Sequence, residues 1–245
     1  NFLVHYDRDF NLLSQKEIVE DLPRERIRSI NVEGLEDCRL VSDGWFTCTT
    51  FDTNPAGRPQ ITACHMDSHG EVEKLVPLLG PDPNRCEKNW LPFMKDGQLH
   101  LIYSCDPFIL YRPDLETGVC ETVLEYKPFL DFSSFRGSAA PLPFDDGYLM
   151  LVHEVVVQPD YTRVYLHRFV FLDQDFTITK LSSPFTFRHQ GVEYCCGMAI
   201  NHTETELILT TGIEDREAYL CFIGLDSVRS ALKAGSELSE GAPTR

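Results

Sequence analysis

The sequence lacks any apolar run near the eighteen or so residues that a membrane-spanning helix needs, and no signal peptide is visible. Cations are also scarce, because 22 Lys and Arg face 38 Asp and Glu, for a formal net charge of −16. This charge argues against nucleic acid as a ligand, since such binding depends on cations that neutralise phosphates, and against anionic membranes. We therefore expect neither nucleic-acid nor membrane partners.

Several motifs of well-known enzyme classes are absent. There is no GxSxG elbow, no P-loop and no HExxH sequence, so acyl transfer, nucleotide hydrolysis and zinc proteolysis are not expected. The nine cysteines are an odd set without a CxxC pair. This pattern favours reduced thiols in a cytoplasmic protein over a disulfide framework or a zinc site. We predict no metal site and no cofactor.

The composition predicts a folded domain. Hydrophobic residues make up 42% and aromatic residues 11% of the 245 positions, which is enough for a substantial core. We predict one all-β domain over residues 1–235 and a polar C-terminal tail over 236–245. The segment from Asp226 to Ala234 is the one stretch that looks helical, because its apolar residues share one face.

A unit of short strands repeats along the chain. Its openings, at Glu36, Glu87, Phe135 and Cys195, are 51, 48 and 60 residues apart. A period near 50 with about four strands per unit is typical of a β-propeller. The predicted strands are 40–41, 45–51, 60–66, 74–79, 90–94, 99–104, 108–112, 119–126, 138–144, 148–157, 165–172, 177–185, 196–201, 206–211 and 218–225.

We predict five blades, of which the first is incomplete at the N-terminus. The sequence begins directly with a strand at residues 1–7. We therefore expect this strand to be the outer part of that blade, and we expect further sequence upstream. Asp-Gly turns at Asp43-Gly44, Asp96-Gly97 and Asp146-Gly147 separate the first two strands of three units, as in hairpins.

Polar residues at the blade openings carry the functional prediction, because in a propeller these openings converge on one central pocket. The residues are Asp37, Arg39, Lys88, Asn89, Arg136, Glu193 and Asp215, with His153 and Arg168 on later strands of the third unit. Clustered Arg and Lys side chains beside a carboxylate are typical of a site that holds an oxyanion next to a proton donor.

Structural alternatives stay open for these residues. Asp37 and Arg39 would also suit a buried ion pair between blades, and Asp215 a charged turn in solvent. Trp90 fits either the core or a sugar-stacking face. Neighbours such as His153 and Glu154 lie on opposite faces of a strand, so only one of them faces a site.

Glu36-Asp37-Cys38-Arg39 resembles the Glu-Asp-Pro-Arg motif of glycoside hydrolase family 130, the β-mannoside phosphorylases and their relatives. Lys88-Asn89 is similar to the Lys-Asn segment of that family. The run from Arg136 to Pro141, with Asp146-Gly147-Tyr148 and His153 after it, resembles the family's Gly-rich strand and Asp-Gly-Trp-Leu…His pattern. Together these motifs cover roughly residues 30 to 220.

Three segments resemble propeller domains found beside glycosyltransferase and tetratricopeptide modules even more closely. These segments are Lys88 to Phe93, Tyr165 to Phe169 and Asp215 to Ala218. The family resemblance implies a five-bladed propeller with a central sugar site. It implies that Asp37 is the proton donor and that Lys88, Arg136 and Arg168 bind phosphate, a possible co-substrate. Cys38 stands where the family has proline.

Three functions follow as hypotheses, and the sequence leaves open whether the chain is an enzyme. The first is a carbohydrate-active propeller that cleaves or forms a mannoside-type bond, with Asp37 as acid and with an oligosaccharide or sugar phosphate as partner. If Glu193 or Asp215 faces Asp37, hydrolysis becomes the better hypothesis, because an inverting hydrolase needs two carboxylates. The alternatives are a non-catalytic glycan- or sugar-phosphate-binding module attached to a glycosyltransferase, and an interaction scaffold.

Overall fold

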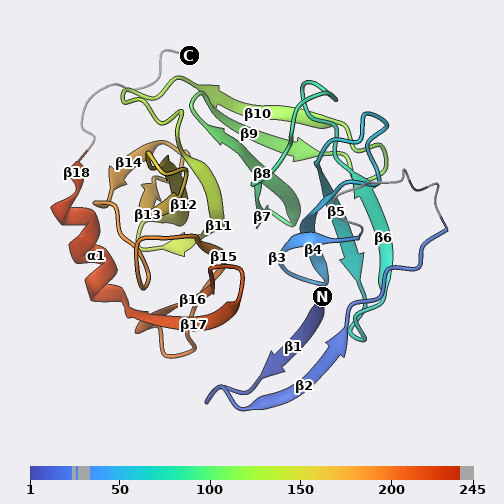
Figure 1. Cartoon of the computed structure of the whole chain (residues 1–245), viewed down its shortest axis with the longest axis horizontal. Coiled ribbons are helices and arrows are strands. Elements are labelled where there is room, and N and C mark those ends of the chain that lie inside the picture. The colour runs from blue at the N-terminus through green and yellow to red at the C-terminus, as the bar shows by residue number, and fades with distance from the viewer. Residues whose placement is uncertain (24–25, 27–33, 238–245) are drawn as a thin grey trace. The chain divides into compact units, whose positions relative to one another are not determined.

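The computed structural model describes residues 1–23, 26 and 34–237 (Figure 1). The described chain is built of strands and one helix, and it divides into two compact units. The first unit comprises residues 1–100 and 112–121, and the second comprises 101–111 and the chain from 122 onward. The predicted polar tail lies outside the described residues except for Ser236 and Glu237, which form a short strand.

The first unit contains a hairpin and a four-stranded antiparallel sheet. The hairpin is formed by β1 (Phe2–Tyr6) and β2 (Leu12–Glu17), and the sheet by β3 (Glu36–Leu40), β4 (Trp45–Thr50), β5 (Gln60–Met66) and β6 (Val72–Pro77). Val19, just after the hairpin, forms a parallel bridge with Glu71 at the edge of this sheet. Apolar residues of both parts, including Leu3, Phe46 and Met66, share one core cluster.

A second four-stranded sheet contributes residues to both units. Its strands are β7 (Leu91–Lys95), β8 (Gln98–Cys105), β9 (Phe108–Pro113) and β10 (Cys120–Tyr126), in the spatial order β10-β9-β8-β7. Sequence neighbours are therefore also neighbours in space, as in an up-and-down propeller blade.

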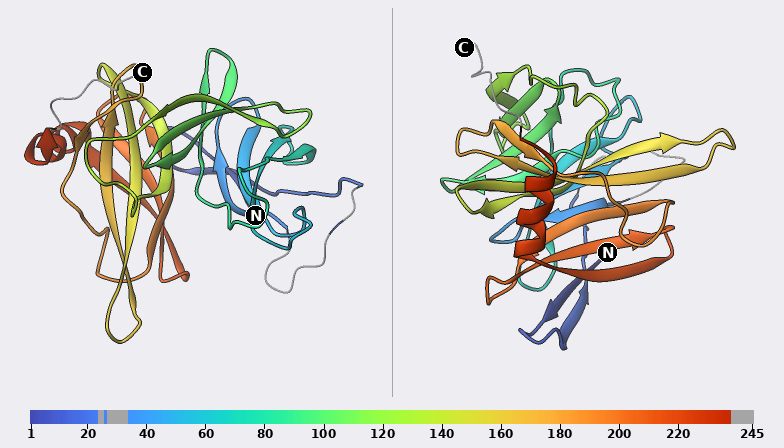
Figure 2. Two further views of the ribbon diagram at one scale, coloured as in Figure 1. Left: turned by 90° about the horizontal axis from the view of Figure 1, so that it is seen from above. Right: turned by 90° about the vertical axis from the view of Figure 1, so that its left-hand side faces the viewer.

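The second unit contains two further sheets. One joins β11 (Arg136–Phe144), β12 (Gly147–Val157), β13 (Arg163–Leu172), β14 (Ile178–Leu181) and β18 (Ser236–Glu237), and the other joins β15 (Glu193–Ile200), β16 (Glu206–Ile213) and β17 (Glu217–Gly224). The long β12–β13 hairpin projects beyond the other strands of its sheet (Figure 2).

The helix α1 (Leu225–Ala234) closes the core of the second unit. Its buried residues Leu225, Val228 and Leu232 pack in one cluster with Leu151 and Phe169 of the neighbouring sheet. Their spacing of three and four residues is what places them on one face of a helix. The predicted helix is thereby confirmed.

Two of the three predicted Asp-Gly turns form as expected, whereas the third lies one residue earlier, at Asp145-Asp146, because Gly147 already pairs with Phe144. Asp43 and Gly44 have φ of 52° and 79°, and Asp96 and Gly97 have φ of 51° and 73°. Positive φ at both central residues defines the type I′ turn, whose twist matches that of antiparallel strands. A Cβ on Gly44 would also come within 2.3 Å of the carbonyl oxygen of Met66, so only glycine fits there.

Strands form in all four predicted units, but several bounds differ. The strand expected over 40–41 lies earlier, as β3 (Glu36–Leu40), and the one expected over 196–201 is β15 (Glu193–Ile200). The strand expected over 177–185 is the shorter β14 (Ile178–Leu181), and β18 pairs with its other edge. The fourth unit has three strands. The described residues thus form four sheets of three or more strands, and a fifth blade that includes β1 and β2 stays a prediction. All nine cysteines are free thiols in the structure.

Two adjacent threonines of β4 differ in their hydrogen bonding, which generates a prediction about stability. Thr49 and Thr50 are both fully buried. The Thr50 hydroxyl lies 2.7 Å from that of Thr62 and 2.6 Å from that of Thr53. The Thr49 hydroxyl has no hydrogen-bond partner among the described residues.

We expect Thr49→Val to leave the stability unchanged or raise it by about 1 kcal/mol, because it removes a buried polar group that lacks a partner. The matched change Thr50→Val should lower the free energy of unfolding by about 1 kcal/mol, because the hydroxyls that contact Thr50 lose a partner. Urea unfolding of the three proteins checks both. Equal losses in the two variants would contradict the assignment.

Candidate functional site

The start of β3 carries a bulge that contains the candidate acid. Glu36 pairs with Thr49 and Arg39 pairs with Thr47, so three steps on β3 oppose two on β4. Asp37, inside the bulge, has φ of 53°, a conformation that few non-glycine residues adopt. Bulges redirect the side chains that they contain and are common beside active sites.

Asn89 occupies the corresponding place before β7. Its φ of 64° is close to the 53° of Asp37, so the two strand starts share a left-handed residue although the repeat in sequence aligns Glu36 with Glu87. The two positions are joined by Arg39, which is 2% exposed. Its Nη1 donates to the carbonyl oxygen of Asp37 at 3.1 Å, and its Nη2 donates to Asn89 Oδ1 at 3.3 Å.

Lys88 is held by an acid that the sequence analysis did not place in the site. Its Nζ lies 3.0 Å from Glu36 Oε2, and both side chains are about one third exposed (31% and 33%). The same Nζ lies 5.1 Å from the centre of the Phe51 ring, within the range of a cation–π contact. Lys88 is thus a cation reachable from solvent with a fixed position.

Trp90 belongs to the core, which decides between its two interpretations. It is 1% exposed, and its Nε1 donates to Glu87 Oε2 at 3.2 Å. Glu87 is itself buried, and its backbone N–H donates to the carbonyl oxygen of Pro59. Trp90 therefore offers no sugar-stacking face and instead fixes the segment that carries Lys88 and Asn89.

In the second unit, His153 lies in a buried layer of aromatic rings. It is 2% exposed, and its Nδ1 lies 2.8 Å from Ser138 Oγ. Its ring stacks on Tyr165 at 5.3 Å and meets Tyr194 edge-on at 5.5 Å. Arg136, its register partner on β11, is exposed.

Arg168 lies on the other face of the same sheet. His153 pairs with His167, so the next residue on β13, Arg168, points to the opposite face. Its Nε donates to Glu154 Oε2 at 2.7 Å, and its Nη1 donates to the carbonyl oxygen of Ser182 at 3.2 Å. His153 and Arg168 were predicted to reach the same pocket mouth, but the structure does not bring these two side chains together.

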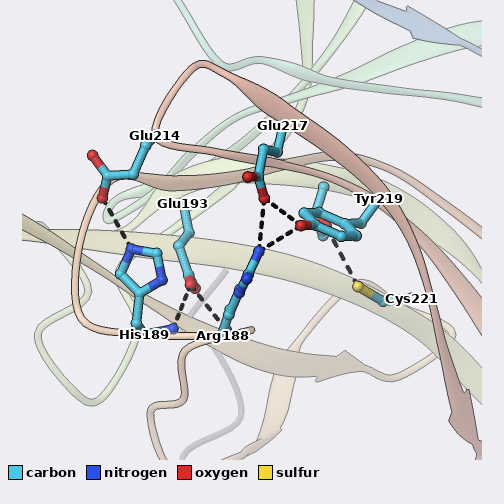
Figure 3. Close-up of polar contacts among 8 residues, drawn as sticks. Arg188, His189, Glu193, Glu214, Glu217, Tyr219 and Cys221 are labelled. Carbon is cyan, nitrogen blue, oxygen red and sulfur yellow. Dashed lines mark hydrogen bonds and ion pairs between the residues drawn. The ribbon is translucent and has the colours of Figure 1, made fainter.

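Glu193 is a buried carboxylate that organises a loop (Figure 3). It is fully buried and accepts the backbone N–H groups of Phe187 at 2.6 Å, Arg188 at 2.9 Å and His189 at 2.8 Å. Three such bonds stabilise a charged carboxylate away from water. These contacts give Glu193 a role in holding the segment before β15.

The same loop is closed on its outer side by exposed groups (Figure 3). Arg188 Nη1 donates to Glu217 Oε2 at 2.7 Å and also contacts the Tyr219 hydroxyl, which donates to Glu217. The bond between Tyr219 and Glu217 raises the pKa of the tyrosine and lowers the pKa of the carboxyl. His189 Nε2 lies 3.2 Å from Glu214 Oε1.

Asp215, another predicted site residue, is exposed in the turn between β16 and β17. Its φ of 51° follows a φ of 52° at Glu214, which is again the pattern of a type I′ turn. This geometry agrees with the alternative of a charged turn in solvent.

The predicted site residues therefore fall into two groups. Asp37, Arg39, Lys88 and Asn89 lie in the first unit, where Arg39 links Asp37 to Asn89, whereas Arg136, His153, Arg168, Glu193 and Asp215 lie in the second. The sequence analysis missed Glu36, Ser138 and Glu154 as direct partners of these residues.

Within residues 1–23, 26 and 34–237, no group of three or more His, Cys, Asp or Glu side chains is placed to hold a metal ion. The short helix α1 is not long or apolar enough to cross a membrane, and the same holds for every helix in the described chain.

His167 gives a prediction about pH. It is fully buried among Phe185, Phe187 and His153, and neither ring nitrogen has a hydrogen-bond partner in the described part of the chain. Burial lowers the pKa of His167 from 6.5 to about 4, although the charge of Glu193 acts in the opposite direction. The unfolded chain therefore binds a proton at His167 more readily than the folded chain does.

Above pH 6.5 we expect His167 to leave the free energy of unfolding independent of pH. As the pH drops from 6.5 towards 4, protonation of His167 in the unfolded chain should lower the free energy of unfolding by up to about 1.4 kcal/mol per pH unit. His167→Phe should flatten that dependence in urea unfolding measured across this range. His202→Gln, at an exposed turn position, is the control and should keep the parent slope. An unchanged slope in His167→Phe would exclude the assignment.

Solved structures place this architecture among the β-propellers. The chain is similar to a β-1,2-mannobiose phosphorylase from Listeria innocua, in complex with β-1,2-mannobiose, at a TM-score of 0.55 and 14% identity, over 82% of this chain and 61% of that one. It is also similar to a mannose phosphorylase from Leishmania mexicana in complex with phosphate ion, at a TM-score of 0.51 and 13% identity, over 78% and 67% of the two chains.

The aligned region thus spans about three fifths (61%) of the length of the Listeria enzyme. No family model matches the sequence, and no curated protein sequence matches it significantly. At these identities the likeness establishes the fold, and the predicted β-propeller is confirmed at that level.

Proposed function

We propose that this chain is a carbohydrate-active propeller that cleaves or forms a mannoside-type glycosidic bond by inverting phosphorolysis. The observation that carries the proposal is the connected group at the start of β3 and β7. There the buried Arg39 joins the backbone of the candidate acid Asp37 to Asn89. The cation Lys88, next to Asn89 in the chain, pairs with Glu36, next to Asp37. The propeller fold shared with two phosphorylases supports the same assignment.

Each residue has a stated role in this reaction. The Asp37 carboxyl gives its proton to the glycosidic oxygen as the bond to the anomeric carbon breaks. An oxygen of inorganic phosphate attacks that carbon from the opposite face, so a sugar 1-phosphate and a shortened sugar leave. A phosphorylase needs no second catalytic carboxylate, since phosphate replaces the activated water of an inverting hydrolase.

The contacts of Glu193 support phosphorolysis over hydrolysis. Its two carboxylate oxygens accept three backbone N–H groups, so it serves the loop before β15. Asp215 is exposed in a turn. Lys88 is the best-placed cation of the first group for phosphate, because it is partly exposed and positioned by Glu36 and Phe51. Arg136 and Arg168 stay proposed phosphate ligands.

Asp37→Asn tests the acid. We expect it to lower the rate of phosphate release from mannose 1-phosphate, with a panel of sugar acceptors, by about 100-fold or more, because a general acid contributes about 10² to 10⁴ to a rate. Asp175→Asn, at an exposed position between β13 and β14, is the control. Unchanged release in Asp37→Asn would overturn the role of Asp37.

Glu36→Gln tests the phosphate site. In the present structure Glu36 neutralises Lys88, so removing that carboxylate charge should strengthen anion binding and lower the KM for phosphate by about 3- to 10-fold. Lys88→Met should raise the same KM by at least about 10-fold. The control is Lys74→Met, whose lysine pairs with Glu116. A higher KM in Glu36→Gln would count against competition between carboxylate and phosphate.

A second candidate is a non-catalytic module that binds a glycan or sugar phosphate, in a protein that also carries a glycosyltransferase. The pairing of Lys88 with Glu36 favours it, because the cation is already neutralised. Sugar binding that survives Asp37→Asn, in a protein without phosphate release, would support this function over phosphorolysis.

A further inference from the structure

A cavity of about 410 Å³ opens in the first unit, away from the candidate acid. Its lining includes Trp45 of β4, Met94 of β7 and Leu99 of β8, with the polar residues Arg112, Asp114 and Glu121. Every lining residue belongs to the first unit. The volume falls at the small end of the roughly 300–1,000 Å³ of small-molecule sites, and the mixture of apolar wall and few polar groups is typical of them.

Trp45 is a fixed aromatic surface in this cavity. It is partly exposed, in contrast to Trp90, the other tryptophan of the chain, which is 1% exposed. The His65 ring meets it edge-on at 5.1 Å. His65 is held at both nitrogens, with Nδ1 3.1 Å from Glu73 Oε2 and Nε2 3.0 Å from the carbonyl oxygen of Asp43. The indole plane is therefore set in advance of any ligand, which reduces the entropy lost on binding.

The polar groups of the cavity are charged and planar. Arg112 Nη2 donates to Glu121 Oε2 at 2.6 Å, with side-chain exposures of 42% and 64%. The Asp114 carboxylate accepts the backbone N–H of Glu116 at 2.8 Å, and this bond lowers its pKa. One guanidinium and two carboxylates give the lining a net charge of about −1, which disfavours phosphates and other anions.

This combination selects the chemistry of the ligand. The apolar C–H face of a pyranose ring packs on an indole, while its hydroxyls accept from guanidinium and donate to carboxylates. A neutral sugar meets all of these groups without bringing a charge into an acidic lining. An apolar ligand would leave the polar groups without partners, at a cost in binding free energy.

The cavity lies at the other end of the strands from Asp37. Along β4, Thr49 pairs with Glu36 whereas Trp45 follows the turn, four residues away. At about 3.3 Å per residue, this separation is about 13 Å. The same holds along the next sheet, where Lys88 precedes β7 and Gln98 follows its turn.

We propose that this cavity is a second carbohydrate-binding site, which holds a neutral pyranose-based oligosaccharide on Trp45 and takes no part in bond cleavage. It goes beyond the proposed phosphorolysis and does not depend on it. A site of this kind keeps a chain end or branch of a long glycan on the protein while the other end is free to reach another site.

Isothermal titration of the chain with β-1,4-mannohexaose, cellohexaose, maltohexaose and chitohexaose tests the proposal. We expect at least one to bind, and Trp45→Ala to weaken that binding at least 10-fold. Trp45→Phe, which keeps a smaller ring, should lose less, and Arg112→Gln should weaken binding by several-fold. Circular dichroism and urea unfolding confirm that each variant is folded.

Asp37→Asn separates this site from the proposed catalytic one. Binding that is unchanged in Asp37→Asn and lost in Trp45→Ala supports the second site, whether or not the protein releases phosphate. Binding lost in Asp37→Asn and kept in Trp45→Ala would place the sugar at the Asp37 group and overturn the proposal. Binding by none of the four oligosaccharides at millimolar concentration would overturn it as well.

Discussion

The buried guanidinium of Arg39 is the contact on which the candidate site of the first unit depends. A guanidinium that is 2% exposed is stable only if its N–H groups find acceptors. The carbonyl oxygen of Asp37 and the amide oxygen of Asn89 are two of them. The hydrogen bonds of this one guanidinium therefore join the starts of two strands that are about fifty residues apart in sequence. The acid and the cation of the proposed chemistry lie at these same strand starts.

The polar groups of the second unit are arranged differently. Ser138 with His153, Glu154 with Arg168, and Glu193 with the loop before β15 are each in close mutual contact. Buried polar groups of this kind mainly specify how the chain packs, because each one satisfies another. The catalytic hypothesis therefore rests more on the first unit than on the second, although the sequence assigned roles to both.

The sequence predicted most of the strands because their causes are local. Alternating apolar residues and the Asp43-Gly44 and Asp96-Gly97 turns each act within a few positions. The site was harder to predict. Whether His153 or Glu154 faces the core depends on the register between β12 and β13, and the partner of Lys88 depends on packing between two sheets. The bulge at Asp37 also arises from pairing with β4, which no single segment encodes.

The left-handed backbone at Asp37 and Asn89 sets stability against the activity proposed for this chain. Such conformations cost about 1 kcal/mol or more for residues with a Cβ, and glycine relieves that cost. Glycine at either position would therefore be favoured in any selection for resistance to heat, and it would remove a carboxyl or amide group from the site. Variants enriched for thermal tolerance alone would be expected to lose the groups that the proposed chemistry needs, so a library should be screened for both properties together.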